Sequence, residues 1–226
     1  QSRNVAVSGK DRAAVMMSGH NADQRWYWDG KQFTSDLAAA PVPRVVPKVN
    51  AAIAAALAQP RPALEAPPYC QSKARPIAVE GGGQPVGLGR FARAAGDAAA
   101  LRASPELDGD TLALAAGLVD EMQLGRGAAP DILSVSLSAT DYVGHAYGTE
   151  GEEMCLNMVE LDREIGDFLA VLDNRGIDYA VALTADHGGK DLPERERALG
   201  SSTVGAILTA QLGLSGPGLI GGSNFG

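Results

Sequence analysis

Three short apolar runs in this chain are each followed at once by polar side chains that can do chemistry. The runs are residues 4–7, 131–138 and 178–184, and they consist largely of valine, leucine and alanine. Continuous runs of this kind predict strands that are buried on both faces, as in a parallel sheet. Because open α/β sheets carry their sites beyond the carboxyl ends of the strands, the residues after each run are the first candidates for function.

Two longer segments have the periodicity and the end signals of helices. Residues 110–124 begin with Asp and end at Gly125, and residues 151–174 stop before Gly176. The second segment carries one apolar stripe with alternating spacings of four and three, formed by Met154, Met158, Leu161, Ile165, Phe168 and Leu172. This stripe predicts one buried helix face, in which the methionines are core residues and not ligands. Helices alternating with strands predict a layered α/β fold with a central, mostly parallel sheet flanked by helices.

Residues 41–89 differ in composition from the rest of the chain. They contain most of the 13 prolines, an alanine-rich helical run at 51–58 and three consecutive glycines at 81–83. The glycines lack the spacing of a phosphate-binding loop and predict a plain turn. We interpret 41–89 as a Pro/Gly-rich insertion or cap within a single domain that spans residues 1–226.

The charge, the length of the apolar runs and the number of cysteines narrow the kind of protein that this chain can be. The formal net charge of -8 argues against nucleic acid, which needs a dense basic face, although a local pocket can still accept a small phosphorylated molecule. No apolar run approaches the roughly 20 residues that cross a bilayer. The two cysteines, Cys70 and Cys155, are too few for a disulfide framework. Cys155 is most simply a core residue, and the sequence leaves open whether the two form a single bridge.

Carboxylates and imidazoles follow two of the three predicted strands. Asp141 and His145 are four residues apart after the second run, and Asp186 and His187 are adjacent after the third. A buried Asp needs a counter-charge, and a metal ion is a common one. These side chains suit zinc, but the residues alone leave a metal site and ordinary surface pairs equally open. The third histidine, His20, has no acidic neighbour in place, so we expect it to be structural or exposed.

The motifs resemble those of a known family. Residues 8–12 (SGKDR), 138–145 (SATDYVGH) and 184–189 (TADHGG) are similar to motifs of the alkaline phosphatase superfamily. The similarity is to its nucleotide pyrophosphatase/phosphodiesterase branch, and within it to bacterial alkaline phosphatases with a threonine nucleophile. The resemblance implies an alkaline phosphatase-like fold with two zinc ions, one bound by Asp141 and His145 and the other by Asp186 and His187. It also implies that Lys10 and Arg12 bind the substrate phosphate.

The function implied by the resemblance is hydrolysis of phosphate monoesters through a covalent phospho-enzyme, in the periplasm or outside the cell. The family takes its nucleophile threonine, a further Asp ligand and a last His ligand from motifs that this chain lacks. We therefore expect a fragment of a larger enzyme that is inactive alone. Two alternatives remain open: a phosphodiesterase of the same branch, and a metal-binding remnant without catalysis. The aromatic residues Trp26, Tyr27 and Trp28 are expected to pack beneath the site or line its mouth.

Overall fold

The computed structural model describes residues 2–79 and 84–189 of the chain. The chain divides into two compact units. The first comprises Gln1–Pro76 and Val86–Leu192 and carries all the helices and strands named below. The second comprises Ile77–Pro85 and Pro193–Gly226, of which only residues 77–79 and 84–85 are described. In the described residues, no helix combines the length and the apolar character needed to cross a membrane.

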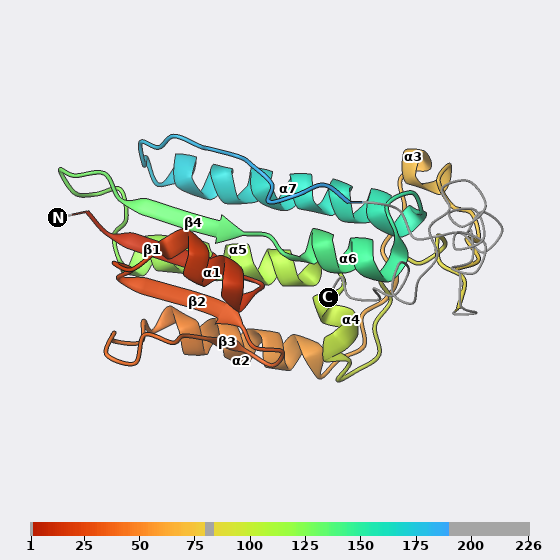
Figure 1. Ribbon diagram of the computed structural model, residues 1–226, viewed down its shortest axis with the longest axis horizontal. Helices are drawn as coiled ribbons and strands as arrows, with labels where there is room; N and C mark the ends of the chain where they lie inside the picture. The colour runs from red at the N-terminus through yellow and green to blue at the C-terminus, as the bar shows by residue number, and fades with distance from the viewer. Residues whose placement is uncertain (1, 80–83, 190–226) are drawn as a thin grey trace, which may run out of the picture. The chain divides into compact units, whose positions relative to one another are not determined.

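A four-stranded, mostly parallel sheet lies at the centre of the first unit (Figure 1). Its strands are β1 (Asn4–Ser8), β2 (Gln24–Trp28), β3 (Phe33–Thr34) and β4 (Ile132–Ser136), in the order β3-β2-β1-β4. β1 runs parallel to both β2 and β4, whereas β3 is antiparallel to β2. Ser8 is in register with Tyr27 on one side and Ser136 on the other. The carboxyl ends of three strands therefore meet at one edge of the sheet.

The described chain has seven helices in addition to these strands. They are α1 (Asp11–Ser18), α2 (Val45–Leu57), α3 (Pro68–Gln71), α4 (Ala98–Arg102), α5 (Glu106–Glu121), α6 (Ala139–Tyr147) and α7 (Glu152–Asn174). Figure 1 shows α1 in front of the strands and α5 behind them. α5 also packs against α2 and α7, and α6 packs against α7. The predicted α/β class, with a mostly parallel sheet between helices, is confirmed.

The main hydrophobic core lies between the sheet and α5. Val5 and Val7 of β1 are fully buried there, and so are Leu114 and Leu118 of α5. Ile53 of α2 belongs to the same core. The alanine-rich run predicted as helical within residues 41–89 is thus α2, and it is part of the helical layer; the described structure shows no separate cap formed by these residues.

The predicted strand at residues 178–184 is wrong in this structure. These residues form no strand, and Val181 and Leu183 are 61% and 85% exposed. A strand needs a neighbour for its backbone hydrogen bonds, and in the described residues no backbone hydrogen bond joins 178–189 to β4. β4 is accordingly an edge strand of the described sheet, and its side chains are only partly buried.

The predicted helix at 151–174 is confirmed by α7, but its predicted buried stripe is only partly right. Leu172 is buried, whereas Met158 is 49% exposed. The first turns of α7 bury Leu156 and Asn157 instead, because α6 packs against the helix there. The sequence also missed β2, whose Trp26 and Trp28 were expected only as an aromatic cluster; both are buried in the main core.

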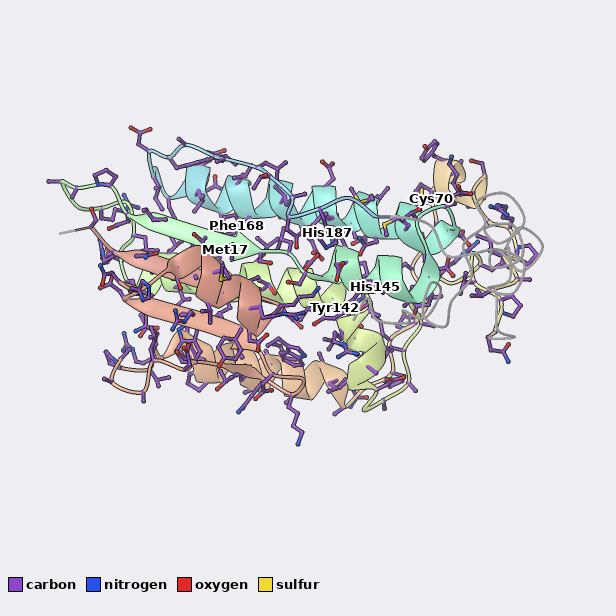
Figure 2. The ribbon with its side chains drawn as sticks, in the orientation of Figure 1. Met17, Cys70, Tyr142, His145, Phe168 and His187 are labelled. Atoms are coloured by element: carbon purple, nitrogen blue, oxygen red, sulfur yellow. A yellow bond between two sulfur atoms is a disulfide. The ribbon has the colours of Figure 1, made fainter. Side chains whose placement is uncertain are left out.

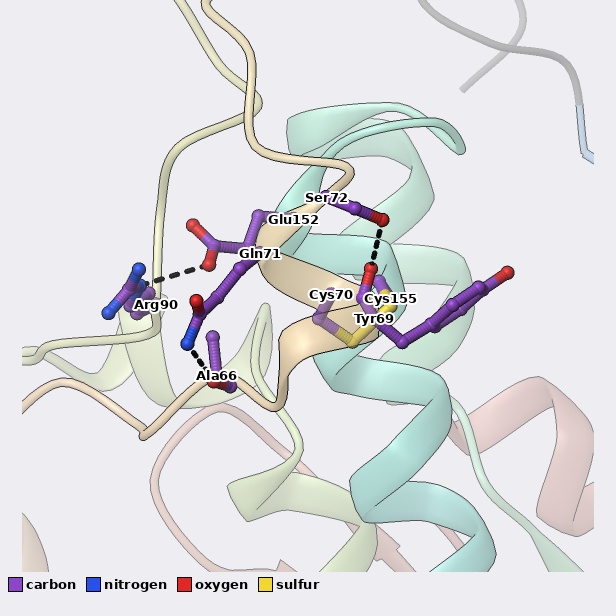
Figure 3. The surroundings of a disulfide bond; sticks show 8 residues. All are labelled: Ala66, Tyr69, Cys70, Gln71, Ser72, Arg90, Glu152 and Cys155. Atoms are coloured by element: carbon purple, nitrogen blue, oxygen red, sulfur yellow. Dashed lines mark hydrogen bonds and ion pairs between the residues drawn. A yellow bond between two sulfur atoms is a disulfide. The ribbon is translucent and has the colours of Figure 1, made fainter.

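A disulfide bond joins α3 to α7 (Figure 3). Cys70 and Cys155 are 85 residues apart in sequence, and their Cα atoms are 5.4 Å apart. Cys70 is fully buried in a second hydrophobic cluster, together with Val143 of α6 and Leu156 of α7. The bridge that the sequence left open is therefore formed, and it fixes α3 to the helix that backs α6.

Candidate metal and phosphate site

The turn after β1 and the start of α6 approach each other closely at the carboxyl edge of the sheet. Gly9 lies at this approach, where a Cβ atom would be 2.9 Å from both Leu107 Cδ2 and Ser138 Cβ. Only glycine fits such a gap without displacing its neighbours. Ser138 Oγ lies 3.1 Å from Ser136 Oγ and 3.5 Å from Ser8 Oγ, so the strand ends are also linked through hydroxyl groups. This packing brings Lys10 next to α6.

The first turn of α6 is held from below by two side chains. The Ala139 amide donates a hydrogen bond of 2.9 Å to Asp108 Oδ1 of α5, and Asn157 Nδ2 of α7 donates one of 3.0 Å to Thr140 Oγ1. Because a helix begins with unpaired amides, an acceptor at this point fixes the direction of the helix. α6 then presents Asp141 in its first turn and His145 in its last turn.

Asp141 is the centre of the candidate site. Lys10 Nζ donates a hydrogen bond to Asp141 Oδ2. His145 Nε2 lies 3.4 Å and His187 Nε2 3.6 Å from Asp141 Oδ1. Partial burial would raise the pKa of Asp141, but the hydrogen bond and charge of Lys10, with smaller contributions from the two histidines, outweigh it and lower that pKa. Asp141 is therefore an anionic carboxylate surrounded by nitrogen atoms. Figure 2 shows Tyr142, His145 and His187 in this part of the unit.

His187 is oriented by its own backbone. Its Nδ1 atom lies 2.8 Å from the carbonyl oxygen of Gly188, and because a carbonyl only accepts, Nδ1 carries the proton. This hydrogen bond, followed by the charge of Asp186, raises the pKa of His187. In the neutral ring Nε2 then has the free lone pair, and Nε2 is the atom that faces Asp141. Metal-binding histidines are commonly oriented in this way.

The structure gathers some of the predicted site residues and not others. Lys10, Asp141, His145 and His187 form one cluster. Asp186 is at its margin, with an 89% exposed side chain and Oδ2 3.6 Å from His187 Nε2. Arg12 is exposed in the first turn of α1, and within the described residues it has no hydrogen bond or ion pair with the cluster.

The donor atoms fit zinc, but they are not arranged as a complete coordination sphere. Imidazole nitrogen and carboxylate oxygen are the types of ligand that zinc takes, normally at close to 2 Å and in tetrahedral geometry. In residues 2–79 and 84–189, no group of three or more His, Cys, Asp or Glu side chains is positioned to hold a metal ion. His145 and His187 are 67% and 60% exposed. The described structure thus brings both predicted ligand histidines next to Asp141, with Asp186 at the margin, and does not close these side chains around a common point.

Two residues at this edge had no role in the sequence analysis. The ring of Tyr142, partly buried against the main core, has Lys10 Nζ 4.6 Å and Arg102 Cζ 4.9 Å from its centroid. Tyr142 lies inside the motif that names Asp141 and His145, so its position gave a signal. Arg102 is in α4, where no motif marks it, and the sequence offered no means to find it.

A mostly parallel sheet with carboxylate, imidazole and ammonium groups at the carboxyl ends of its strands defines an α/β protein, a class in which ligands bind at that edge of the sheet. Comparison with known families makes this specific. Residues 6–204 match the family described as Type I phosphodiesterase / nucleotide pyrophosphatase, and the chain belongs to this family. The resemblance found from the motifs is confirmed.

The curated relatives carry the name alkaline phosphatase. The chain is 55% identical over 196 residues to alkaline phosphatase PhoK of Sphingomonas sp, which covers 86% of this chain and 34% of the relative. It is 45% identical over 205 residues to alkaline phosphatase PhoD of Zymomonas mobilis, covering 90% and 35%. The fold is similar to the crystal structure of wild type alkaline phosphatase PafA, with a TM-score of 0.62 and 28% identity over 77% of this chain and 36% of that one. The chain spans about a third of the length of these relatives.

Proposed function

We propose that this chain is part of a full-length protein that hydrolyses phosphate monoesters with two zinc ions, through a covalent phospho-enzyme. The observation that carries the proposal is the gathering of Lys10, His145 and His187 around Asp141 at the carboxyl ends of β1 and β4. The names of PhoK, PhoD and PafA support the same chemistry. Small phosphorylated molecules are the substrates that we propose.

In this proposal each Asp/His pair holds one ion. Asp141 and His145 bind the first zinc, and Asp186 and His187 bind the second. Zinc at such a site lowers the pKa of a hydroxyl nucleophile and offsets negative charge on the phosphoryl and leaving oxygens. The nucleophile is a threonine outside these 226 residues, and each ion takes its remaining ligands from outside them as well.

The residues of this chain have separate tasks. His187 presents Nε2 as a ligand because Nδ1 donates to the Gly188 carbonyl. Lys10 contacts Asp141 only through Oδ2, so Oδ1 would be free to hold a metal ion, and the ammonium would donate to a non-bridging phosphate oxygen. Arg12 would hold a second such oxygen after a change of side-chain conformation. Cations that contact these oxygens stabilise the charge that spreads over them in the transition state.

We also propose that the protein works in the periplasm or outside the cell. Support comes from the Cys70–Cys155 bond, since disulfides persist in oxidising compartments and are rare in the cytosol.

Substitution of two ligands in the full-length protein tests the metal proposal. Asp141→Asn and His187→Ala should each lower the zinc content and reduce kcat/KM for p-nitrophenyl phosphate by about 100-fold or more, because each removes a ligand from an ion that acts on the transition state. His20→Ala is the matched control, since His20 is also exposed but lies outside the cluster. Metal analysis and turnover are measured on the same preparations. Unchanged zinc stoichiometry in both ligand variants would refute the assignment.

A phosphodiesterase activity is the second candidate, and the description of the family favours it. A diester has one charged oxygen fewer than a monoester, so the pair Lys10 and Arg12 argues for the monoester. Turnover of p-nitrophenyl phosphate and bis-p-nitrophenyl phosphate by the wild-type protein separates the two. A full-length protein that binds zinc and hydrolyses neither ester would be the non-catalytic remnant.

A further inference from the structure

Two cations contact the ring of Tyr142 at the candidate site. Lys10 Nζ lies 4.6 Å and Arg102 Cζ 4.9 Å from the centroid of its ring. The two charged groups are therefore no further apart than the sum of these distances. Both contacts are of the cation–π kind, in which the negative face of the ring attracts the charge. Tyr142 is next to Asp141 on α6, so Arg102 stands beside the residues proposed to act on phosphate.

The two cations differ in what else they contact. Lys10 forms an ion pair with Asp141. Arg102 is exposed, and in the described part of the chain it forms no ion pair with a carboxylate. The guanidinium has five N–H donors, and in the described residues none of them donates to a carboxylate. An unpaired arginine held in place on a protein of net charge -8 is therefore arranged to receive an anion.

A purely structural role is the competing explanation. Arg102 is in the last turn of α4, where a positive charge also interacts favourably with the helix dipole. α4 has only five residues, however, so this interaction is small. A charge at that helix end also does not require the guanidinium to contact the ring of Tyr142.

We propose that Arg102 is a specificity-determining residue that binds an oxyanion on the leaving group of the substrate. The inference rests on the proposed function, in which Lys10 binds the phosphoryl group that is transferred. The preferred substrates are then phosphate monoesters whose alcohol part carries a second negative group, either a carboxylate or another phosphate. The guanidinium can donate two parallel hydrogen bonds to either group, since each offers two acceptor oxygens in one plane.

A matched pair of substrates tests this in the full-length protein. Glycerol 1-phosphate and 3-phosphoglycerate differ at one end, where a neutral hydroxymethyl group replaces a carboxylate, and glycerol 1,3-bisphosphate supplies the second phosphate. Arg102→Met keeps an unbranched apolar side chain and removes the charge. It should lower kcat/KM for the two substrates that carry a second anionic group by about 10–100-fold relative to glycerol 1-phosphate, as expected for losing a charged hydrogen bond. Arg102→Lys, which keeps the charge without the fork, should lie between wild type and Arg102→Met.

Lys48→Met is the control for net charge, because Lys48 is exposed on α2 and its removal changes the total charge equally. The measured ratio is kcat/KM for 3-phosphoglycerate, or for glycerol 1,3-bisphosphate, divided by kcat/KM for glycerol 1-phosphate. Lys48→Met should leave both ratios unchanged. A ratio that stays at the wild-type value in Arg102→Met, with all three substrates affected alike, overturns the inference and leaves the proposed function standing. Loss of the ratio for only one of the two anions identifies which oxyanion Arg102 binds. A wild-type protein that hydrolyses none of the three refutes the proposed function and this inference with it.

Discussion

Two acidic side chains, one on α5 and one on α7, each have a buried oxygen atom without a hydrogen-bond partner within the described structure. Asp108 is 1% exposed, and although Oδ1 accepts the Ala139 amide, Oδ2 has no hydrogen-bond partner within the described structure. Glu164 Oε2 on α7 is also a buried oxygen without a hydrogen-bond partner within the described structure. Burial raises the pKa of Asp108 to about 7; burial, and then the charge of Asp108, raises the pKa of Glu164 to about 7. Both groups thus hold protons more tightly in the folded state than in the unfolded one.

This has a consequence for stability at different pH. A carboxyl group whose pKa is raised on folding makes the folded state less stable once the group has to ionise. For Asp108 this loss of stability develops as the pH rises from about 4 through 7. Asp108→Asn keeps an acceptor for the Ala139 amide but cannot ionise. At pH 8 the variant should exceed wild type in free energy of unfolding by on the order of 1–4 kcal/mol. Near pH 4 the advantage should disappear.

Denaturant titrations at pH 4.5 and pH 8 measure this difference. Asp162→Asn serves as the control, because Asp162 is an exposed carboxylate on α7, the helix that also carries Glu164. An equal effect of Asp108→Asn at both pH values would mean that the carboxylate is compensated in the folded state.

Sequence motifs named side chains of the candidate site in advance, but not the neighbouring residues that contact α6. Lys10, Asp141, His145 and His187 were named in advance and do lie together. Arg12 and Asp186 were named as well, and whether they join the cluster in the full-length protein stays a prediction. Asp108 and Arg102 could not be found, because their contacts with α6 depend on the packing of α5 and α4 and leave no local pattern.

At the scale of the elements, apolar runs identified β1 and β4 correctly and 178–184 incorrectly. The runs are similar in composition, so composition cannot distinguish a strand that has a neighbour from one that lacks it. The reverse error concerns β2, which contains Arg25. This guanidinium is buried because it pairs with Asp36 and donates to Ser18 Oγ, and such a tertiary pairing is not visible in a single sequence.

Substitution inside 178–184 tests the structure of that segment. Val181→Asp should change the free energy of unfolding of this chain by less than about 0.5 kcal/mol, because Val181 is 61% exposed. Val7→Asp is the comparison, since Val7 is fully buried in β1 and an unpaired carboxylate there should prevent stable folding. Thermal unfolding of the two variants gives the answer. A large loss of stability in Val181→Asp would support the buried strand predicted from sequence.

At the scale of the whole chain, the α/β class and the elements β1, α5, β4 and α7 could be read from periodicity, because those patterns reflect which face of each element is buried. The disulfide could not, since pairing depends on the distance between two cysteines in the folded chain. The disulfide lies at the second hydrophobic cluster, around Cys70, and joins α3 to α7. α7 also packs against α5 of the main core.

Removing this bond should destabilise the chain markedly. A loop of 85 residues is closed by it, for which the expected loss is about 2–5 kcal/mol in the free energy of unfolding. The double variant Cys70→Ala/Cys155→Ala should therefore unfold at a lower temperature than wild type. Dithiothreitol should lower the wild-type midpoint toward that of the variant and leave the variant itself unaffected. A wild-type midpoint that does not respond to complete reduction, checked by thiol titration, would contradict the prediction.

The length of that loop also bears on biosynthesis. At the usual 5–20 residues per second, the ribosome needs about 4–17 s to reach Cys155 after Cys70. During this interval Cys70 is a thiol without its partner. Because these 226 residues contain only these two cysteines, no incorrect bridge can form among them, and any misoxidation must involve a thiol outside them. Errors in maturation should then appear as disulfides between Cys70 or Cys155 and a cysteine outside this segment, in the same protein or in another molecule.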